Sequence, residues 1–195
     1  MMNVQLELVR KLLHALGGVL VILLVKAGVL TLGILGLLIV VFAAIILVNC
    51  KYERELLTKI LTINRADKNI PGMDVLSFAL GCWIVLACLE QPLAFAAIMI
   101  LSFGDPLAHL IGGGLGGRAT TSRNRYLLGG AGGALAGTLG ALMYVPFIPA
   151  LLASVAAMTV EAGELRIANH HIDDNLTIPL VAGVVLWVIN YAFPF

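Results

Sequence analysis

Seven long apolar runs constrain the fold of this chain more than any other feature of its sequence. A helix needs about 20 mostly apolar residues to cross the hydrocarbon core of a bilayer. The runs are continuous rather than alternating, which favours helices over a β-barrel. We therefore expect an all-α fold, a polytopic transmembrane bundle of about seven helices that forms one domain over residues 1–195. The expected spans are residues 12–25, 29–50, 73–89, 92–114, 127–146, 147–162 and 176–193.

Charged side chains are too few for a water-soluble protein of this size. They make up 12% of the residues, against about a quarter in an ordinary soluble domain. This composition excludes a cytosolic enzyme and a disordered chain, and the net charge of +1 gives no sign of nucleic-acid binding. Cys50, Cys82 and Cys88 have no metal-ligand spacing and form no even-numbered framework, so neither zinc nor disulfides are expected.

The basic residues predict the orientation of the bundle. Seven crossings place every lysine and arginine except Lys26, and every acid except Glu90, on the side of the N-terminus. Basic residues are concentrated in cytoplasmic loops, so we expect a cytoplasmic N-terminus and an active site on the cytoplasmic face. Residues 51–72 are expected to form a cytoplasmic connection, in which the helical period of residues 52–63 indicates a short interfacial helix.

An acid within the fourth apolar run is the first candidate functional residue. Asp105 lies between Gly104 and Pro106, and His109 follows four residues later on the same helical face. A carboxylate within a membrane span must face protein, water or a cation, and such residues are usually functional. The alternative is an Asp that caps a half-helix at a kink.

A glycine-rich segment with three arginines follows Asp105. Glycines allow backbone N–H groups to approach an anion, and guanidinium groups bind phosphate oxygens in pairs. Residues 112–126 are therefore expected to form a nucleotide-binding loop, although the spacing is not that of a Walker A loop. The alternative is that the glycines pack helices and the arginines set the topology. The candidate nucleotide-binding residues here are Gly112, Gly116, Arg118, Arg123 and Arg125.

Gly129, Gly133 and Gly137 recur at every fourth residue of the fifth expected span. This small-xxx-small pattern allows membrane helices to touch closely, so we expect these glycines to pack helices rather than to bind a ligand.

An oxygen-rich cluster surrounds the connection between the last two spans. Glu161 ends the sixth span, and Asp173, Asp174 and Asn175 open the seventh after a short turn that holds two histidines. One aspartate would suffice to cap the helix. Carboxylates are the ligands that Mg²⁺ prefers in proteins, so Asp105, Glu161 and Asp174 are predicted to hold a divalent cation, with Asp105, Asp173 and Asp174 as the catalytic candidates.

Polar residues near the N-terminus form one helical stripe. Arg10 and Lys11 are of the kind that anchors a first helix at the lipid headgroups, whereas His14, one turn further along, is expected to face the bundle interior. A structural and a functional role for His14 remain equally open, and the three residues are accessory site candidates.

Together these residues resemble the polyprenol kinase family, which comprises CTP-dependent dolichol kinases, plant phytol kinases and the yeast-type CTP-dependent diacylglycerol kinase. A more distant similarity is to the CDP-diacylglycerol synthases. The most specific part is Glu161 followed by the string Asp173-Asp174-Asn175-Leu176-Thr177-Ile178-Pro179-Leu180. The other parts are Glu7-x-x-Arg10-Lys11-x-x-His14, Pro71-Gly72, and Gly104-Asp105-x-x-Ala108-x-x-x-Gly112 with Gly116 and Arg118 beyond it.

The resemblance implies a membrane kinase of lipid metabolism that transfers the γ-phosphate of CTP, with Mg²⁺, to a lipid alcohol in the bilayer. The acceptor would be of the polyprenol, dolichol, phytol or diacylglycerol type, and Asn175 would join the nucleotide-binding residues. One departure concerns the Lys-Ser/Thr-x-Glu-Gly element of the family, because this chain has Arg125 in place of the Lys and Leu128 in place of the Glu. The positive charge is retained and the carboxylate is not.

Two other functions fit parts of the sequence. A cytidylyltransferase that forms a CDP-lipid would use the same nucleotide and the same acids. A small cation-coupled transporter would use Asp105 and the acidic cluster as an ion path, but it would also need polar residues at both membrane faces or an inverted repeat, and the sequence has neither.

Overall fold

The chain is a bundle of helices in a computed structural model that describes residues 4–52, 72–112, 122–163, 166–167, 170–171 and 173–195. Apart from one short strand pair, the described secondary structure is helical. The helices are α1 (Val4–Lys26), α2 (Leu32–Tyr52), α4 (Met73–Cys88), α5 (Gln91–Met99), the π-helix η1 (Ile100–Gly104), α6 (Asp105–Leu110), α7 (Ser122–Ala141), α8 (Phe147–Ala162) and α9 (Asp174–Ala192).

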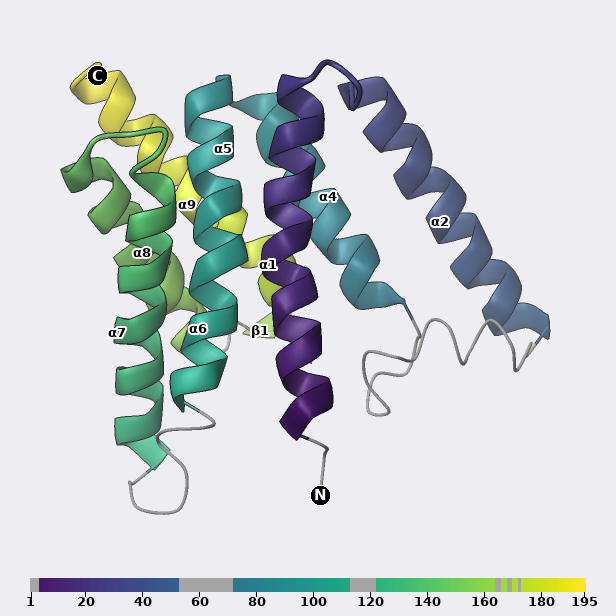
Figure 1. Ribbon diagram of the computed structural model, residues 1–195, viewed down its shortest axis with the longest axis horizontal. Coiled ribbons are helices and arrows are strands. Elements are labelled where there is room, and N and C mark those ends of the chain that lie inside the picture. Colours follow the sequence, from purple (N-terminus) through teal and green to yellow (C-terminus); the bar gives the residue numbers. More distant parts are fainter. Residues whose placement is uncertain (1–3, 53–71, 113–121, 164–165, 168–169, 172) are drawn as a thin grey trace.

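Helices α5, η1 and α6 follow one another without a break, so they form a single rod. With this rod counted once, the described part of the chain contains seven rods, as the apolar runs predict. The N- and C-termini lie at opposite ends of the bundle (Figure 1). Within the single domain predicted over residues 1–195, the predicted connection over 51–72 and the predicted loop over 112–126 lie mostly outside the described ranges.

Three of the described helices are long and apolar enough to cross a membrane. They contain the windows Leu32–Asn49, Gln91–Gly112 and Asp174–Ala192. The helices α4 and α8 are apolar but shorter. Large apolar side chains cover the outside of α1 and α2, among them Leu16, Leu37 and Leu47, each more than 60% exposed. This surface suits a lipid environment, and the chain has the character of a membrane protein.

The rod formed by α5, η1 and α6 is the centre of the bundle. In its membrane-length window 72% of the residues are buried, against 17% for the window in α2. Helices α1, α7 and α9 pack against this rod, whereas α2 packs against α4 (Figure 1). The central position of the rod explains why every residue from Leu93 to Ser102 is buried.

The glycine stripe of α7 packs helices, as its spacing predicts. A Cβ atom added at Gly133 would lie 2.8 Å from the carbonyl oxygen of Gly104, 2.8 Å from the Cβ of Ala108 and 2.7 Å from the Sδ of Met158. One at Gly137 would lie 3.3 Å from Ile100. The stripe therefore brings α7 into close contact with the central rod, and the packing prediction is confirmed.

A pair of alanine variants in α7 tests this close contact. We expect Gly133→Ala to lower the free energy of unfolding by about 1–3 kcal/mol, because the new methyl group would have to displace the backbone of the central rod. Gly130→Ala is the matched control, since its Cβ would meet nothing nearer than 4.0 Å and alanine favours helix over glycine. Thermal unfolding in detergent measures both, and equal melting temperatures would contradict the packing described here.

Several helix boundaries differ from the predicted spans, and the end of α7 has a local reason. Helix α7 ends at Ala141 rather than near residue 146, because a turn precedes Pro146, whose ring restricts the residue before it to extended backbone. The predicted short turn between the last two spans contains an antiparallel pair of two-residue strands, β1 (Arg166–Ile167) and β2 (His170–His171). The predicted sixth span coincides with α8.

Candidate metal centre

Asp105 lies at the junction between the π-helix η1 and α6. It is 3% exposed, so its carboxylate is buried in the bundle. Pro106 follows it in the first turn of α6. Segments of π-helix are rare and often occur at functional sites. The rod thus changes its helical register immediately before the residue that the sequence singles out.

Lys11 pairs with Asp105 across the interface between α1 and the central rod. Its Nζ lies 2.9 Å from Oδ2 and donates a second hydrogen bond of 3.1 Å to Oδ1. The lysine is 6% exposed, so the prediction of a headgroup anchor is wrong for this residue. Two opposite charges that are both buried require each other, because an isolated buried charge is very costly.

A glycine on the same stripe of α1 allows this pairing. Gly18 is buried against η1, and a side chain at this position would collide with the hydroxyl group of Ser102. Since Lys11, His14 and Gly18 are spaced by three and four residues, they share one face of α1. The absence of a side chain at Gly18 therefore lets this face approach η1, with Lys11 against Asp105.

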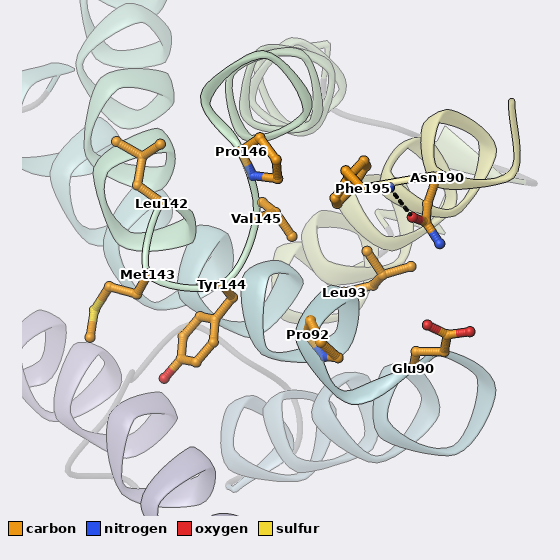
Figure 2. Close-up of a pocket in the computed structure, with 10 residues that line it drawn as sticks. All are labelled: Glu90, Pro92, Leu93, Leu142, Met143, Tyr144, Val145, Pro146, Asn190 and Phe195. Atoms are coloured by element: carbon orange, nitrogen blue, oxygen red, sulfur yellow. Dashed lines mark hydrogen bonds between the residues drawn. The ribbon is translucent and has the colours of Figure 1, made fainter. Parts of the chain in front are cut away.

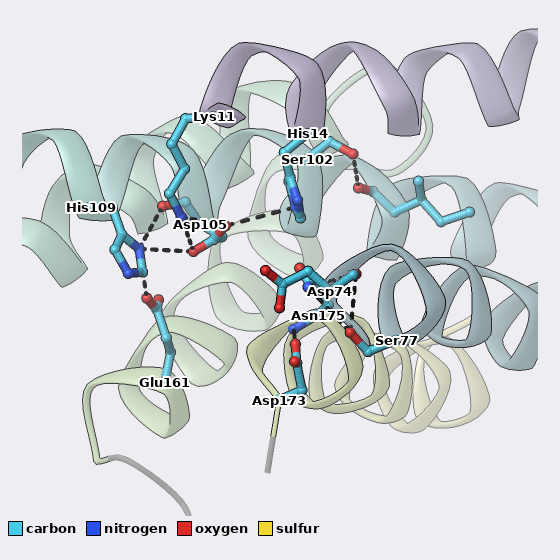
Figure 3. Close-up of polar contacts among 11 residues, drawn as sticks. Lys11, His14, Asp74, Ser77, Ser102, Asp105, His109, Glu161, Asp173 and Asn175 are labelled. Atoms are coloured by element: carbon cyan, nitrogen blue, oxygen red, sulfur yellow. Dashed lines mark hydrogen bonds and ion pairs between the residues drawn. The ribbon is translucent and has the colours of Figure 1, made fainter. Parts of the chain in front are cut away.

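The imidazole groups of His109 and His14 lie on opposite sides of the Asp105 carboxylate (Figure 3). The Nδ1 of His109 is 2.9 Å from Oδ1 of Asp105 and 3.6 Å from Oε1 of Glu161. The Nε2 of His14 is 3.8 Å from Oδ2 of Asp105, and its ring packs edge-on against Phe78 with centroids 4.7 Å apart. His14 therefore faces the bundle interior, as predicted.

Four side chains form a cluster that could hold a metal ion. They are Asp105, His109, Glu161 and Asp174, and each offers one ligand atom, with all four atoms within 4.8 Å of one another. Ligands on one small divalent cation bind at about 2.0–2.2 Å and so lie at most about 4.4 Å apart. Three carboxylates and one imidazole are chemically suited to such an ion, and only a small inward movement would place them around it. The three predicted metal ligands thus come together, joined by His109.

Asp173 and Asn175 have structural contacts beside this cluster. Asp173 is the N-cap of α9, where its Oδ1 accepts a 3.1 Å hydrogen bond from the backbone N–H of Asn175. The amide group of Asn175 donates to the carbonyl oxygen of Asp74 at 3.2 Å and to Ser77 Oγ at 3.4 Å (Figure 3). A side chain at Gly81 would collide with the Asn175 carbonyl, so this glycine permits the close contact between α4 and α9.

The predicted nucleotide-binding loop lies largely outside the described residues. Gly112 is the last described residue after α6, and it packs against Gly129, whose Cβ would lie 3.3 Å from the Gly112 Cα atom. Gly116 and Arg118 are not described, and for Arg10, Arg123 and Arg125 the structure describes the backbone but not the side chain. The predicted roles of these residues stay predictions.

Two contributors to the site are absent from the candidate residues of the sequence. The sequence indicates only that His109 shares a helical face with Asp105, yet its position four residues later on α6 brings its ring to the carboxylate. The backbone carbonyl oxygen of Asp74 accepts a hydrogen bond from Asn175. The sequence indicates no such role for Asp74 beyond its position shortly after Pro71-Gly72.

A cavity of about 400 Å³ lies at the other end of the bundle, near the C-terminus (Figure 2). Its lining includes Glu90, Tyr144 and Asn190, and none of the four residues of the cluster contributes to it. The candidate metal centre and this cavity are therefore separate features.

In comparisons with known proteins, the chain matches no family model, no curated protein and no solved structure. The function must therefore be inferred from the chemistry of the cluster and its place in the bundle.

Proposed function

We propose that the chain is a CTP-dependent lipid-alcohol kinase of the membrane, which phosphorylates a polyprenol or dolichol-type hydroxyl group, or one of the phytol or diacylglycerol type. The observation that carries the proposal is the cluster of Asp105, His109, Glu161 and Asp174 beside the buried Lys11. Phosphoryl transfer depends mainly on positioning and charge stabilisation, and a polar cluster of this kind within an apolar bundle is suited to both.

Each carboxylate in the cluster has a place in the proposed reaction. Asp105, Glu161 and Asp174 would hold a divalent cation such as Mg²⁺, which when bound offsets the charge of the triphosphate. The lipid hydroxyl oxygen forms a bond to the γ-phosphorus, the bond from that phosphorus to the β–γ bridging oxygen breaks, and CDP leaves. The hydroxyl proton passes to a carboxylate, for which we propose Asp174.

The phosphates of CTP are proposed to lie on the glycine and arginine segment that follows the central rod. Guanidinium groups bind phosphate oxygens in pairs, and glycine backbone approaches them closely. Asn175 is the proposed contact from α9, and Arg10, Lys11 and His14 are the accessory residues from α1. The residues proposed for the phosphates are Gly112, Gly116, Arg118, Arg123 and Arg125.

The bundle is proposed to span the membrane with the end that carries the N-terminus in the cytoplasm. The cluster lies towards that end, because the central rod, α8 and α9 all bring their polar ends to it. The exposed apolar side chains of the helices would contact lipid, and the acceptor alcohol would reach the cluster at headgroup level. A water-soluble donor and a lipid acceptor can meet only at such an interface.

Labelled CTP tests the proposed reaction directly. We expect purified protein in detergent, with Mg²⁺ and a panel of lipid alcohols, to transfer label from γ-labelled CTP to lipid and none from α-labelled CTP. Thin-layer chromatography separates the lipid product from the nucleotide. Label from the α position would indicate a cytidylyltransferase, whose acceptor would be a phosphorylated lipid. Absence of lipid product from both labels, with cation flux in proteoliposomes, would support the transporter instead.

A further inference from the structure

One donor in the four-residue cluster differs in chemistry from the other three. His109 offers a nitrogen atom, whereas Asp105, Glu161 and Asp174 offer carboxylate oxygens. Mg²⁺ is bound in proteins by oxygen ligands and water, and imidazole is a ligand of first-row transition ions. The donor set is therefore not the one that a site dedicated to Mg²⁺ would have.

The position of His109 directs one of its ring nitrogen atoms into the cluster. It lies one helical turn after Asp105 in α6, so both side chains leave the same face of the rod. The ring atom directed at the carboxylates is Nδ1, which is 2.9 Å from Asp105 Oδ1 and 3.6 Å from Glu161 Oε1. The ligand atom that His109 offers to the cluster lies within 4.8 Å of the one that Asp174 contributes.

The second histidine near Asp105 does not share this arrangement. The Nε2 of His14 is 3.8 Å from the other carboxylate oxygen, Oδ2, which Lys11 contacts at 2.9 Å. Lys11 also donates a 3.1 Å hydrogen bond to Oδ1, so the ammonium group contacts both oxygens of Asp105. Only on the Oδ1 side, however, do His109 and Glu161 add further ligand atoms next to the carboxylate (Figure 3).

We infer that Nδ1 of His109 is a metal ligand together with the three carboxylates, so that the centre selects a first-row transition ion over Mg²⁺. Mn²⁺ is the expected member of this class, because it combines a preference for carboxylate ligands with acceptance of imidazole. The inference rests on the metal centre of the proposed function, but it requires neither CTP nor a lipid acceptor.

The alternative is that His109 only bridges Asp105 and Glu161 by hydrogen bonds. A bound ion would then have oxygen ligands alone, and exchanging the imidazole for an amide would leave the choice of ion almost unchanged. Spectroscopy of the bound ion separates the two cases, because a directly bound ¹⁴N nucleus couples to the electron spin of Mn²⁺ and a distant one does not.

The experiment uses the full chain, purified in detergent without nucleotide or lipid alcohol. Mn²⁺ is titrated and followed by electron paramagnetic resonance, Mg²⁺ is added as a competitor, and the bound ion is measured by electron spin-echo modulation. We expect one bound Mn²⁺ with ¹⁴N modulation. In His109→Gln we expect the modulation to vanish and Mn²⁺ affinity to fall at least about tenfold, with Mg²⁺ affinity changed less than about threefold.

Three other variants are the matched controls, since the chain has four histidines. His14→Gln, His170→Gln and His171→Gln should each keep the ¹⁴N modulation of the wild type. Bound Mn²⁺ without this modulation, or modulation that survives in His109→Gln, would overturn the inference. So would a protein that binds Mg²⁺ as tightly as Mn²⁺.

The result can be separated from the test of the proposed function. A nitrogen-coupled Mn²⁺ ion in a protein that makes no labelled lipid would support the inference and contradict the kinase. Phosphorylated lipid from γ-labelled CTP, with a bound ion that has oxygen ligands only, would support the kinase and overturn the inference.

Discussion

The Asp105→Asn variant is expected to lose lipid phosphorylation on the order of a thousandfold relative to the wild type. Asparagine has the shape of aspartate but carries no charge, so it would hold a divalent cation poorly and leave Lys11 without its partner. The measurement is the initial rate of label transfer from γ-labelled CTP to a polyprenol at saturating Mg²⁺, in detergent.

Two further variants make this result interpretable. Glu161→Gln removes a second carboxylate from the cluster without leaving a buried lysine unpaired. It should also lower the rate of lipid phosphorylation. Glu90→Gln changes an exposed acid at the opposite end of the bundle and should phosphorylate lipid at the wild-type rate. Unchanged activity of Asp105→Asn would remove Asp105 from the chemistry, and with it the proposed kinase.

The buried ion pair between Lys11 and Asp105 is expected to appear as strong coupling in a double-mutant cycle. We expect Lys11→Met and Asp105→Asn each to lower the free energy of unfolding by about 3–5 kcal/mol, because each leaves one uncompensated charge in the core. The double variant contains neither charge, so it should lie within about 1–2 kcal/mol of the wild type, without recovering activity.

The cycle is measured by thermal or denaturant unfolding in detergent with a chelator present, so that bound metal does not contribute. Lys26→Met is the matched control on the same helix, since Lys26 is exposed and its ammonium group lies over the rings of Phe95 and Tyr144. Lys26→Met should lower the free energy of unfolding by about 1 kcal/mol or less. Additive effects of the two core variants would show that the charges do not stabilise each other.

Much of the fold could be predicted because apolar length dominates this sequence. The run that gives α8 begins at Phe147 and ends before a glycine, so hydropathy alone finds both boundaries. Helix α1 begins at Val4, well before its apolar run, because a helix continues through polar residues when one face is still apolar. The end of α7 depends on a turn and on Pro146, which a count of apolar residues does not detect.

The gathering of Asp105, Glu161 and Asp174 could also be predicted, because acids within apolar helices must face one another, water or a cation. The role of Lys11 could not. A lysine near a helix end can extend its chain to the headgroups or turn inward to an acid, and the choice depends on the rotation of α1. That rotation is set by Gly18 against Ser102, a contact between segments that are distant in the sequence.

The π-helix η1 has a consequence for how the site tolerates changes in chain length. A π turn holds about one residue more than an α turn, and each residue of an α-helix rotates the side chain by about 100°. If one residue were deleted from Ile100–Gly104, the rod could close into regular α-helix, and Asp105 would then point to a different neighbour while α5 kept its packing. The direction in which the Asp105 carboxylate points thus depends on the number of residues in η1, independently of which residues they are.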